Sequence, residues 1–200
     1  MQTELDFYFD FGSPASFLAY KRLLQFEKKY DLKINYKPML LGAVFKATQN
    51  SSPITVPAKG AYMMKHDIPR FAKRYGVAFV MNPHFPINTL QLMRGAHAAI
   101  KLGCFPTYCD AVYDAIWGKG LNMGDATIVL ETLTKANIDA AAVIELANDP
   151  EVKQSLASVT EEAIKRGAFG APTLYIGDEM FFGQDRLDFV EEYLAEARHR

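Results

Sequence analysis

The first apolar stretch of the chain is the feature that most limits what it can fold into. Every second residue from Leu5 to Phe11 is apolar, so these side chains share one face of a β-strand. Directly after Ser13 and Pro14 the apolar residues follow helical spacing instead. The sequence therefore predicts a strand, a tight turn and a helix in immediate succession.

Ser13 lies at the junction between this strand and this helix. Pro14 suits the first turn of a helix because its missing N–H would have no partner there, and a serine directly before it is a favoured N-cap. Ser13 is also placed where the helix dipole and the strand end converge. Two interpretations stay open: a serine that only caps the helix, or one that also belongs to a functional site.

A second alternating segment follows the first helix, which we expect to end near Tyr30. It runs from Leu32 to Lys37 and stops at Pro38. Because a helix connects the two strands, we expect them to be parallel and to form a right-handed βαβ unit.

A long helical block comes next. From Leu40 to about Arg166 the apolar spacing is helical, and no convincing strand interrupts it. The helices expected inside the block cover residues 58–75, 88–102, 106–118, 125–135, 139–148 and 150–166.

Strand patterns return near the end of the chain. Residues 171–176 and 179–182 read as two strands joined by a tight turn at Gly177 and Asp178, and a last helix opens after Gly183. Without the helical block, this order of elements is that of a thioredoxin-like core. We therefore predict an α/β fold. Residues 1–39 and 167–200 form the thioredoxin-like domain in this prediction, and residues 40–166 form an inserted helical domain.

Composition excludes several classes of function. The 200 residues carry a formal net charge of −1 and no block of like charge, so we expect no nucleic-acid partner. No apolar run approaches the length needed to span a bilayer, and the first strand begins soon after Met1, so we expect a soluble, cytoplasmic protein without membrane contact.

The potential metal ligands are few and badly spaced. Cys104 and Cys109 lack the spacing of a redox pair or a zinc site, so we expect reduced, buried thiols. The histidines we interpret as incidental, without metal or triad spacing, are His66, His84 and His97. No metal site is predicted.

Charge is distributed unevenly along the chain. Residues 21–75 contain twelve Lys and Arg but three Asp and Glu, a balance of +9 that leaves −10 for the rest. Such a segment either draws a small anion into a cleft or forms a solvated basic face.

Five separated motifs occur in the order typical of one family. They are Phe9-Asp10-Phe11-Gly12-Ser13-Pro14-Ala15-Ser16-Phe17-Leu18-Ala19, Asn50 with Val56-Pro57-Ala58-Lys59-Gly60, Phe85-Pro86-Ile87-Asn88-Thr89, Gly167-Ala168-Phe169-Gly170-Ala171-Pro172-Thr173 and Phe182-Gly183-Gln184-Asp185-Arg186-Leu187. Together they resemble 2-hydroxychromene-2-carboxylate isomerases and the related kappa-class glutathione transferases. The resemblance implies a thioredoxin-like domain with a helical insertion, glutathione as cofactor and a homodimer.

The resemblance implies a catalytic role for Ser13. Periplasmic disulfide oxidoreductases, which share the arrangement of domains, place cysteines where this chain has Ser13 and Ser16, so a thiol would have to come from glutathione. The Ser13 hydroxyl would donate a hydrogen bond to the glutathione sulfur, and the helix N-terminus would favour its anionic form. A free thiol has a pKa of about 8.5, so a depression of roughly two units makes the thiolate the majority form near neutral pH.

Other residues are implied to bind the rest of glutathione. Ala171, before what looks like a cis Pro172, would pair its backbone with the cysteinyl part. Asn50 and Lys59 would lie near the tripeptide, with Lys59 available to a carboxylate, and Asp185 near the γ-glutamyl ammonium. Each has a simpler alternative. Asn50 fits an Asx turn, Lys59 an exposed helix lysine, and Asp185 a carboxylate at a helix N-terminus.

A small aromatic substrate is implied for a hydrophobic pocket between the core and the insertion. Asn88 and Trp117 are the candidates to line it, although Trp117 also has the helical spacing of a core residue. The chain departs from the family in placing Ala15 where relatives usually have an aromatic residue, and Ala171 where they commonly have a bulkier one. The smaller Ala15 is expected to enlarge the pocket or to remove a stacking surface.

Three classes of function follow. In the isomerase, the glutathione thiolate adds reversibly to a ring-opened enone, so that 2-hydroxychromene-2-carboxylate and trans-o-hydroxybenzylidenepyruvate interconvert during breakdown of naphthalene-like aromatics. A kappa-like transferase or peroxidase would consume glutathione instead. A non-catalytic thioredoxin-like binding module would use Ser13 as a helix cap alone.

Overall fold

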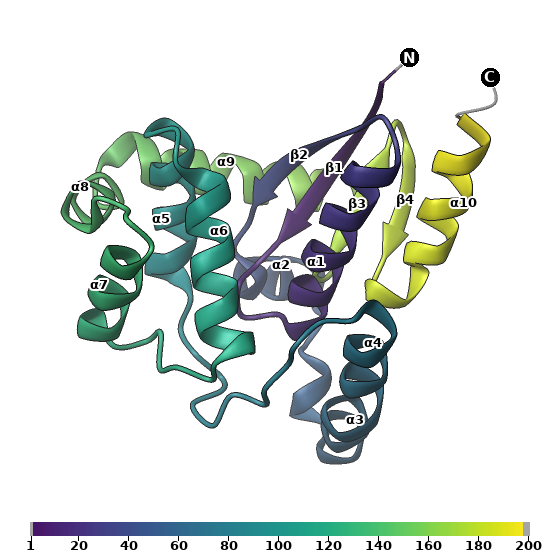
Figure 1. Cartoon of the computed structure of the whole chain (residues 1–200), viewed down its shortest axis with the longest axis horizontal. Helices are drawn as coiled ribbons and strands as arrows, with labels where there is room; N and C mark the ends of the chain where they lie inside the picture. Colours follow the sequence, from purple (N-terminus) through teal and green to yellow (C-terminus); the bar gives the residue numbers. More distant parts are fainter. Residues whose placement is uncertain (1, 198–200) are drawn as a thin grey trace.

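Four strands form a single sheet in the order β2-β1-β3-β4. The structure is a computed structural model that describes residues 2–197. The strands are β1 (Thr3–Phe9), β2 (Leu32–Pro38), β3 (Thr173–Ile176) and β4 (Glu179–Phe182). β1 and β2 are parallel, whereas β3 is antiparallel to both β1 and β4. The two central strands therefore come from opposite ends of the chain (Figure 1).

Ten α-helices surround or extend from this sheet within residues 2–197. They are α1 (Pro14–Lys29), α2 (Leu41–Thr48), α3 (Pro57–Tyr62), α4 (Ile68–Tyr75), α5 (Leu90–Lys101), α6 (Phe105–Tyr113), α7 (Ala126–Lys135), α8 (Ala140–Leu146), α9 (Pro150–Lys165) and α10 (Leu187–Ala197). A π-helical turn, Met63–Asp67, joins α3 to α4, and another, Asp114–Gly118, extends α6. No helix in the described part of the chain has the length and apolar character needed to cross a membrane.

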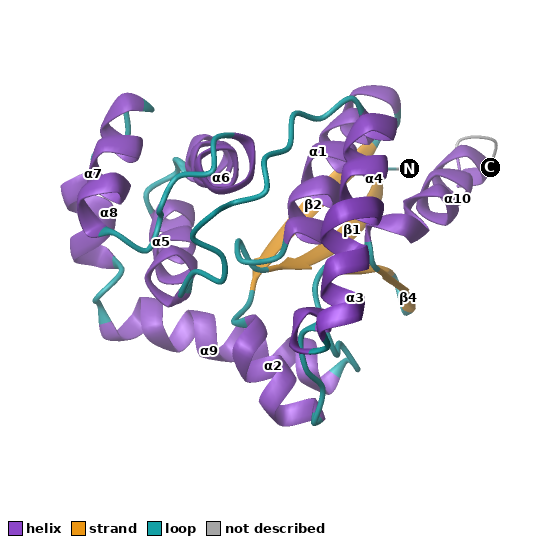
Figure 2. Ribbon diagram, turned by 90° about the horizontal axis from the view of Figure 1, so that it is seen from below, coloured by secondary structure: helices purple, strands orange, loops and turns teal. Residues whose placement is uncertain are grey.

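The sheet is buried on both faces. Leu5, Phe7 and Phe9 are fully buried on one face, in the same core as α1 and α6. Tyr8 and Tyr175 lie in a smaller core with residues of α2 and α9. Figure 2 shows α1 and α4 on one side of the sheet and α2 and α9 on the other, with α5 to α8 grouped beside it.

His97 is one of the residues that attach this helical group to the sheet. Its ring nitrogens lie 3.0 Å from the Pro38 carbonyl oxygen and 2.9 Å from the Ser155 hydroxyl oxygen. Burial lowers the pKa of His97, so the neutral imidazole is favoured. This histidine therefore joins α5 to the end of β2 and to α9.

The predicted fold class is confirmed: a thioredoxin-like α/β fold carries a helical insertion between β2 and β3. The parallel βαβ unit and the antiparallel hairpin were both predicted. Three details differ. β1 ends at Phe9 rather than Phe11, the helix expected over residues 58–75 contains the π-helical turn, and α2 was not predicted as a separate helix. The cysteines form no disulfide, and Cys109 is buried whereas Cys104 is half-buried.

Candidate active site

A cavity of about 390 Å³ opens at the start of α1. Its walls come from the first turn of α1, the segment from α2 to α3, the loop before β3 and the turn after β4. Five of the six residues predicted to activate or bind glutathione line it. They are Ser13, Asn50, Lys59, Ala171 and Asp185. The fold thus brings together residues from both ends of the chain.

Ser13 both caps α1 and reaches across to the strand region. Its hydroxyl oxygen accepts a hydrogen bond from the Ser16 backbone N–H at 3.1 Å and donates one to the Ala171 carbonyl oxygen at 3.1 Å. The capping interpretation is therefore confirmed. The same hydroxyl lies in the cavity wall, so capping and a functional role are compatible.

The backbone before β3 has an edge available for pairing. The Ala171–Pro172 peptide bond is cis, and the Pro172 carbonyl accepts a hydrogen bond from the Gly183 N–H at 3.0 Å. The Ala171 N–H donates to no group within residues 2–197. Pro172 itself is buried and does not line the cavity, so it acts on the site through the backbone that it holds.

Lys59 is the cation of this cavity. Three of the twelve cations in residues 21–75 pair with acidic residues near the C-terminus: Arg22 and Lys29 contact Glu191, and Arg74 contacts Asp188. In contrast, Lys59 forms no ion pair with any residue that the structure describes. Its ammonium group is therefore available to an anionic ligand.

Asp185 lines the same cavity close to the turn after β4. Its carboxylate pairs with the neighbouring Arg186 guanidinium, and the Asp185 side chain remains 39% exposed. Gly183 has a positive φ of 89°, and a Cβ atom there would lie 2.5 Å from the Asp185 Oδ1. A glycine at this position thus lets the carboxylate fold back against the turn.

Asn50 ties two walls of the cavity together. Its side-chain amide donates to the Phe169 carbonyl at 2.8 Å, and its side-chain oxygen accepts from the Ser51 N–H at 2.8 Å. The structure therefore gives Asn50 a local turn contact and a contact to the loop before β3, and both ends of its amide are engaged.

Part of the cavity wall is aromatic. The rings of Phe169 and Phe182 lie 4.4 Å apart between centroids, and Phe45 and Phe85 line the same space. Ala15, which stands where relatives usually carry an aromatic residue, also lines it. The cavity thus offers an apolar surface beside its charged groups, as a ligand with both ionic and aromatic parts requires.

Trp117 lies behind this wall. Its side chain is fully buried, its indole N–H donates to the Phe11 carbonyl at 2.8 Å, and its ring packs on Phe79 and Phe85. Since Phe85 lines the cavity, Trp117 supports the wall without lining it. This corresponds to the core-packing alternative for Trp117.

Asn88 lies outside the Ser13 cavity as well. Its side-chain oxygen accepts a hydrogen bond from the Leu90 N–H at 3.1 Å, just before α5, and the residue lines a second cavity within the helical insertion. The structure therefore separates Asn88 from Trp117, which the sequence analysis had placed in one substrate pocket.

The sequence analysis missed Asp10. Its buried carboxylate accepts hydrogen bonds from the Gly12 N–H at 2.8 Å, the Leu41 N–H at 2.9 Å and the Thr89 hydroxyl at 2.7 Å. Burial raises the pKa of Asp10 despite these three donors. Asp10 thus joins the turn before α1, the start of α2 and the segment before α5. An acidic residue at the end of an apolar strand was the available signal.

Comparison with known proteins places this site in a family. The family model for the DsbA-like thioredoxin domain matches residues 4–195. The chain belongs to this family. It is 31% identical to a 2-hydroxychromene-2-carboxylate isomerase of Sphingobium xenophagum, over 98% of this chain and 100% of that protein. It is 27% identical to glutathione S-transferase kappa 1 of Rattus norvegicus, over 96% of this chain and 91% of that protein.

A solved structure supports the same relationship. The structure of a selenomethionine 2-hydroxychromene-2-carboxylate isomerase aligns with a TM-score of 0.88 and 30% sequence identity, covering 97% of this chain and 95% of the other. The resemblance inferred from the five motifs is thereby confirmed at the level of the family.

Proposed function

We propose that this protein is a glutathione-dependent isomerase that interconverts 2-hydroxychromene-2-carboxylate and trans-o-hydroxybenzylidenepyruvate. Similarity to isomerases over nearly the whole chain supports the reaction class. The observation that carries the proposal is the position of the Ser13 hydroxyl. It lies at the N-terminus of α1, in the wall of a cavity that also contains Lys59 and Asp185.

The groups in the cavity match the chemistry of glutathione. This tripeptide carries two carboxylates, one ammonium group and one thiol. The Lys59 ammonium suits a carboxylate, the Asp185 carboxylate suits the ammonium group, and the Ala171 N–H suits backbone pairing with the cysteinyl part.

Ser13 can change hydrogen-bond partner without losing its role as a cap. Its single hydroxyl proton points to the Ala171 carbonyl, while a lone pair of the same oxygen accepts from Ser16 N–H. Rotation about the C–O bond would redirect the proton into the cavity and leave the capping bond in place. A proton donor at the helix N-terminus favours a bound anion, because both stabilise negative charge.

Bound glutathione would supply the thiolate that adds to the enone of the substrate and leaves again after rotation about the resulting single bond. The residues of this chain orient the two partners. Lys59 and Asp185 fix the ends of the tripeptide, and the aromatic wall formed by Phe45, Phe85, Phe169 and Phe182 accepts the substrate ring. The small side chain of Ala15 leaves additional room beside Ser13.

A kappa-like transferase or peroxidase is the second candidate, supported by 27% identity to the rat kappa transferase over 96% of this chain. The free-thiol concentration during turnover distinguishes the isomerase from the transferase or peroxidase. During turnover of 2-hydroxychromene-2-carboxylate, an isomerase leaves the free-thiol concentration constant, whereas a transferase or peroxidase lowers it as product accumulates.

The test combines binding with turnover. We expect glutathione to bind with measurable heat in a calorimetric titration, and to accelerate interconversion of the two isomers at concentrations far below that of the substrate. Glutathione binding without isomerisation would exclude the isomerase. No heat and no thermal shift at millimolar glutathione would leave the non-catalytic binding module instead.

A further inference from the structure

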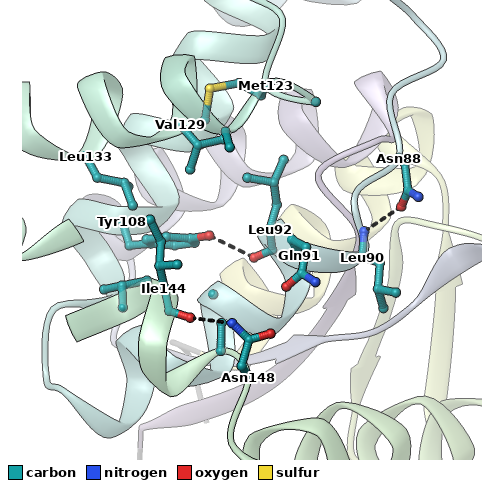
Figure 3. Close-up of a pocket in the computed structure, with 15 residues that line it drawn as sticks. Asn88, Leu90, Gln91, Leu92, Tyr108, Met123, Val129, Leu133, Ile144 and Asn148 are labelled. Carbon is teal, nitrogen blue, oxygen red and sulfur yellow. Dashed lines mark hydrogen bonds between the residues drawn. The ribbon is translucent and has the colours of Figure 1, made fainter. Parts of the chain in front are cut away.

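A second cavity lies inside the helical insertion, away from Ser13. Its volume is about 350 Å³, and its walls come from α5, α6, α7 and α8 together with the loops beside α5 and α7 (Figure 3). It shares no lining residue with the Ser13 cavity. A ligand bound in this second cavity would therefore not compete with glutathione bound in the Ser13 cavity.

The lining is apolar and carries no formal charge. Leu92, Met123, Val129 and Leu133 project into the space in Figure 3. The residues that line the cavity include no Asp, Glu, Lys, Arg or His. A charged group placed against this apolar lining would lose its hydration without gaining a partner of opposite charge, so the lining selects against ions.

Polar contacts are limited to a few amides. Asn88 accepts from the Leu90 N–H, and the Asn148 amide donates to the Ile144 carbonyl. Gln91, labelled between them in Figure 3, has no side-chain hydrogen bond to any residue that the structure describes. Asn88 and Asn148 each use one end of the amide in these bonds, and all three amides lie at the solvent-exposed mouth of the cavity. A mostly apolar pocket with amides at its mouth, of which Gln91 is wholly unpaired within the described residues, suits an uncharged ligand that has one polar group.

One wall of the cavity is rigidly held. The Tyr108 hydroxyl donates to the Leu92 carbonyl at 2.9 Å, and Tyr108 is almost completely buried. Gly95 permits this position, because a Cβ atom there would lie 2.2 Å from the Tyr108 hydroxyl oxygen. The ring of Tyr108 is therefore fixed by two neighbouring turns of α5.

The volume sets the size of the ligand. An apolar cavity of about 150 Å³ in another protein binds one benzene molecule. The cavity described here is roughly twice as large, at about 350 Å³. It has room for two fused rings rather than one.

We propose that this cavity is a binding site for a neutral two-ring aromatic molecule with a single hydroxyl or carbonyl group, which bonds to Gln91. The carboxylate substrate proposed for the Ser13 cavity does not fit this description, because nothing in the lining compensates its charge. The two cavities thus take ligands of different charge.

The probe for this proposal is 2-naphthol, with the charged 2-naphthoate as its matched control. Binding is measured by calorimetry and by naphthol fluorescence at pH 7, first on the protein without glutathione and then with glutathione added. We expect one saturable site for 2-naphthol and at least tenfold weaker binding of 2-naphthoate. No saturable binding, equal binding of the two probes, or displacement of 2-naphthol by glutathione would overturn the proposal.

Two variants locate the site. Val129→Phe fills the cavity and is expected to weaken 2-naphthol binding at least tenfold. Gln91→Ala removes the unpaired amide and introduces no larger side chain, so it tests the site even if Val129→Phe fails to fold. We expect this variant to bind 2-naphthol several-fold more weakly. Unchanged affinity in a folded Val129→Phe or in Gln91→Ala would overturn the proposal. The two variants are compared without glutathione and without substrate turnover, so this failure is separate from failure of the proposed function.

Discussion

The hydroxyl of Ser13 has one proton and two acceptor positions, and its geometry decides what a substitution removes. Ser13→Ala loses both the capping bond from the Ser16 N–H and the hydroxyl proton, which bonds to the Ala171 carbonyl and which we propose turns to a bound ligand. A hydrogen bond to a charged group contributes about 1.5–3 kcal/mol, so we predict a loss of about 10- to 100-fold in kcat/KM for isomerisation. We also predict a loss of about 1 kcal/mol in the free energy of unfolding, from the missing cap.

Ser16→Ala is the matched control. The Ser16 hydroxyl is buried without a hydrogen-bond partner in the described part of the chain. Its removal is therefore expected to leave kcat/KM within twofold and not to lower stability. Equal losses in both variants, measured by initial rates and urea unfolding, would show that Ser13 acts only on the fold.

Lys59 tests the recognition of a carboxylate. Lys59→Gln keeps a polar side chain, one atom shorter, but removes the charge, so the KM for glutathione is predicted to rise about tenfold while kcat stays within twofold. Lys65→Gln is the control, because Lys65 is exposed on the following turn and lies outside the cavity. A similar rise in both variants would indicate a general effect of charge.

Asp10 makes stability depend on pH in a direction that can be stated in advance. Burial raises its pKa above the ordinary value of 3.8, so the folded protein holds this proton to a higher pH than the unfolded chain does. The free energy of unfolding therefore falls as pH rises from the unfolded pKa toward the folded pKa. The asparagine in Asp10→Asn does not titrate, so this variant lacks the contribution of Asp10 to the pH dependence of the free energy of unfolding.

We therefore predict that the stability advantage of the wild type over Asp10→Asn is largest at about pH 4 and shrinks toward neutral pH. Urea unfolding at a series of pH values measures it. An advantage that grows with pH would mean that the three donors to the carboxylate outweigh its burial.

At the scale of elements, the contact between α3 and the short 3₁₀ turn Pro53–Thr55 shapes one wall of the Ser13 cavity. A Cβ atom on Gly60 would lie 2.9 Å from the Ile54 Cα, so Gly60→Ala must push the turn away from α3. We predict a loss of about 1–3 kcal/mol in stability and a raised KM for glutathione.

Gly42→Ala provides the comparison on α2. A Cβ atom on Gly42 meets nothing within 4 Å, and alanine is favoured over glycine in a helix by up to about 1 kcal/mol. This variant is predicted to gain stability and keep its KM. Thermal unfolding and glutathione kinetics are measured on both variants. If Gly42→Ala behaved like Gly60→Ala, the effect would come from the loss of a glycine and not from crowding against Ile54.

The elements differed in how far the sequence predicts them. Alternation in residues 5–11 and the turn at Gly177 and Asp178 are local signals, and both led to correct strands. α2 was missed because it lacks such signals. Its N-cap is Leu40, which has no side-chain capping bond, and Val44 is its only buried residue. The apolar spacing of Leu41, Val44 and Phe45 fits a helix, but a short helix without a capping side chain offers no start signal that separates it from the rest of the helical block.

The site was predictable only in part. Ser13 was identified from its place between a strand and a helix, and the family motifs added Lys59, Ala171 and Asp185, which line one cavity. The contact between Asp10 and Thr89 joins residues 79 positions apart, and no local pattern encodes such a distance. Trp117 was ambiguous because helical spacing is the same for a core residue and for a pocket residue.

At the scale of the whole molecule, Arg166 connects the end of the insertion to the sheet. Its guanidinium donates to the Asp6 carboxylate at 2.5 Å, to the Tyr8 hydroxyl at 3.0 Å and to the Gly177 carbonyl at 3.1 Å, and it lies 3.8 Å from the ring centre of Tyr175. A lysine cannot make this forked set of contacts.

We predict that Arg166→Lys lowers the free energy of unfolding by about 1–3 kcal/mol, since the pair with Asp6 is only about a quarter exposed. Arg70→Lys is the control, because its pair with Asp67 is exposed and 3.7 Å long, and is expected to contribute little. Equal effects of the two substitutions on urea unfolding would show that the contacts of the Arg166 guanidinium do not stabilise the fold more than an exposed ion pair does.

The position of β3 between β1 and β4 has a consequence for protein synthesis. Ser13 is made early, but the Ala171 carbonyl that it contacts is added 158 residues later. Until then β1 lacks one of its two neighbours in the sheet and the cavity lacks a wall. A ribosome-bound fragment that stops before β3 is therefore expected to retain no affinity for glutathione-agarose, however much of its helical insertion has already folded.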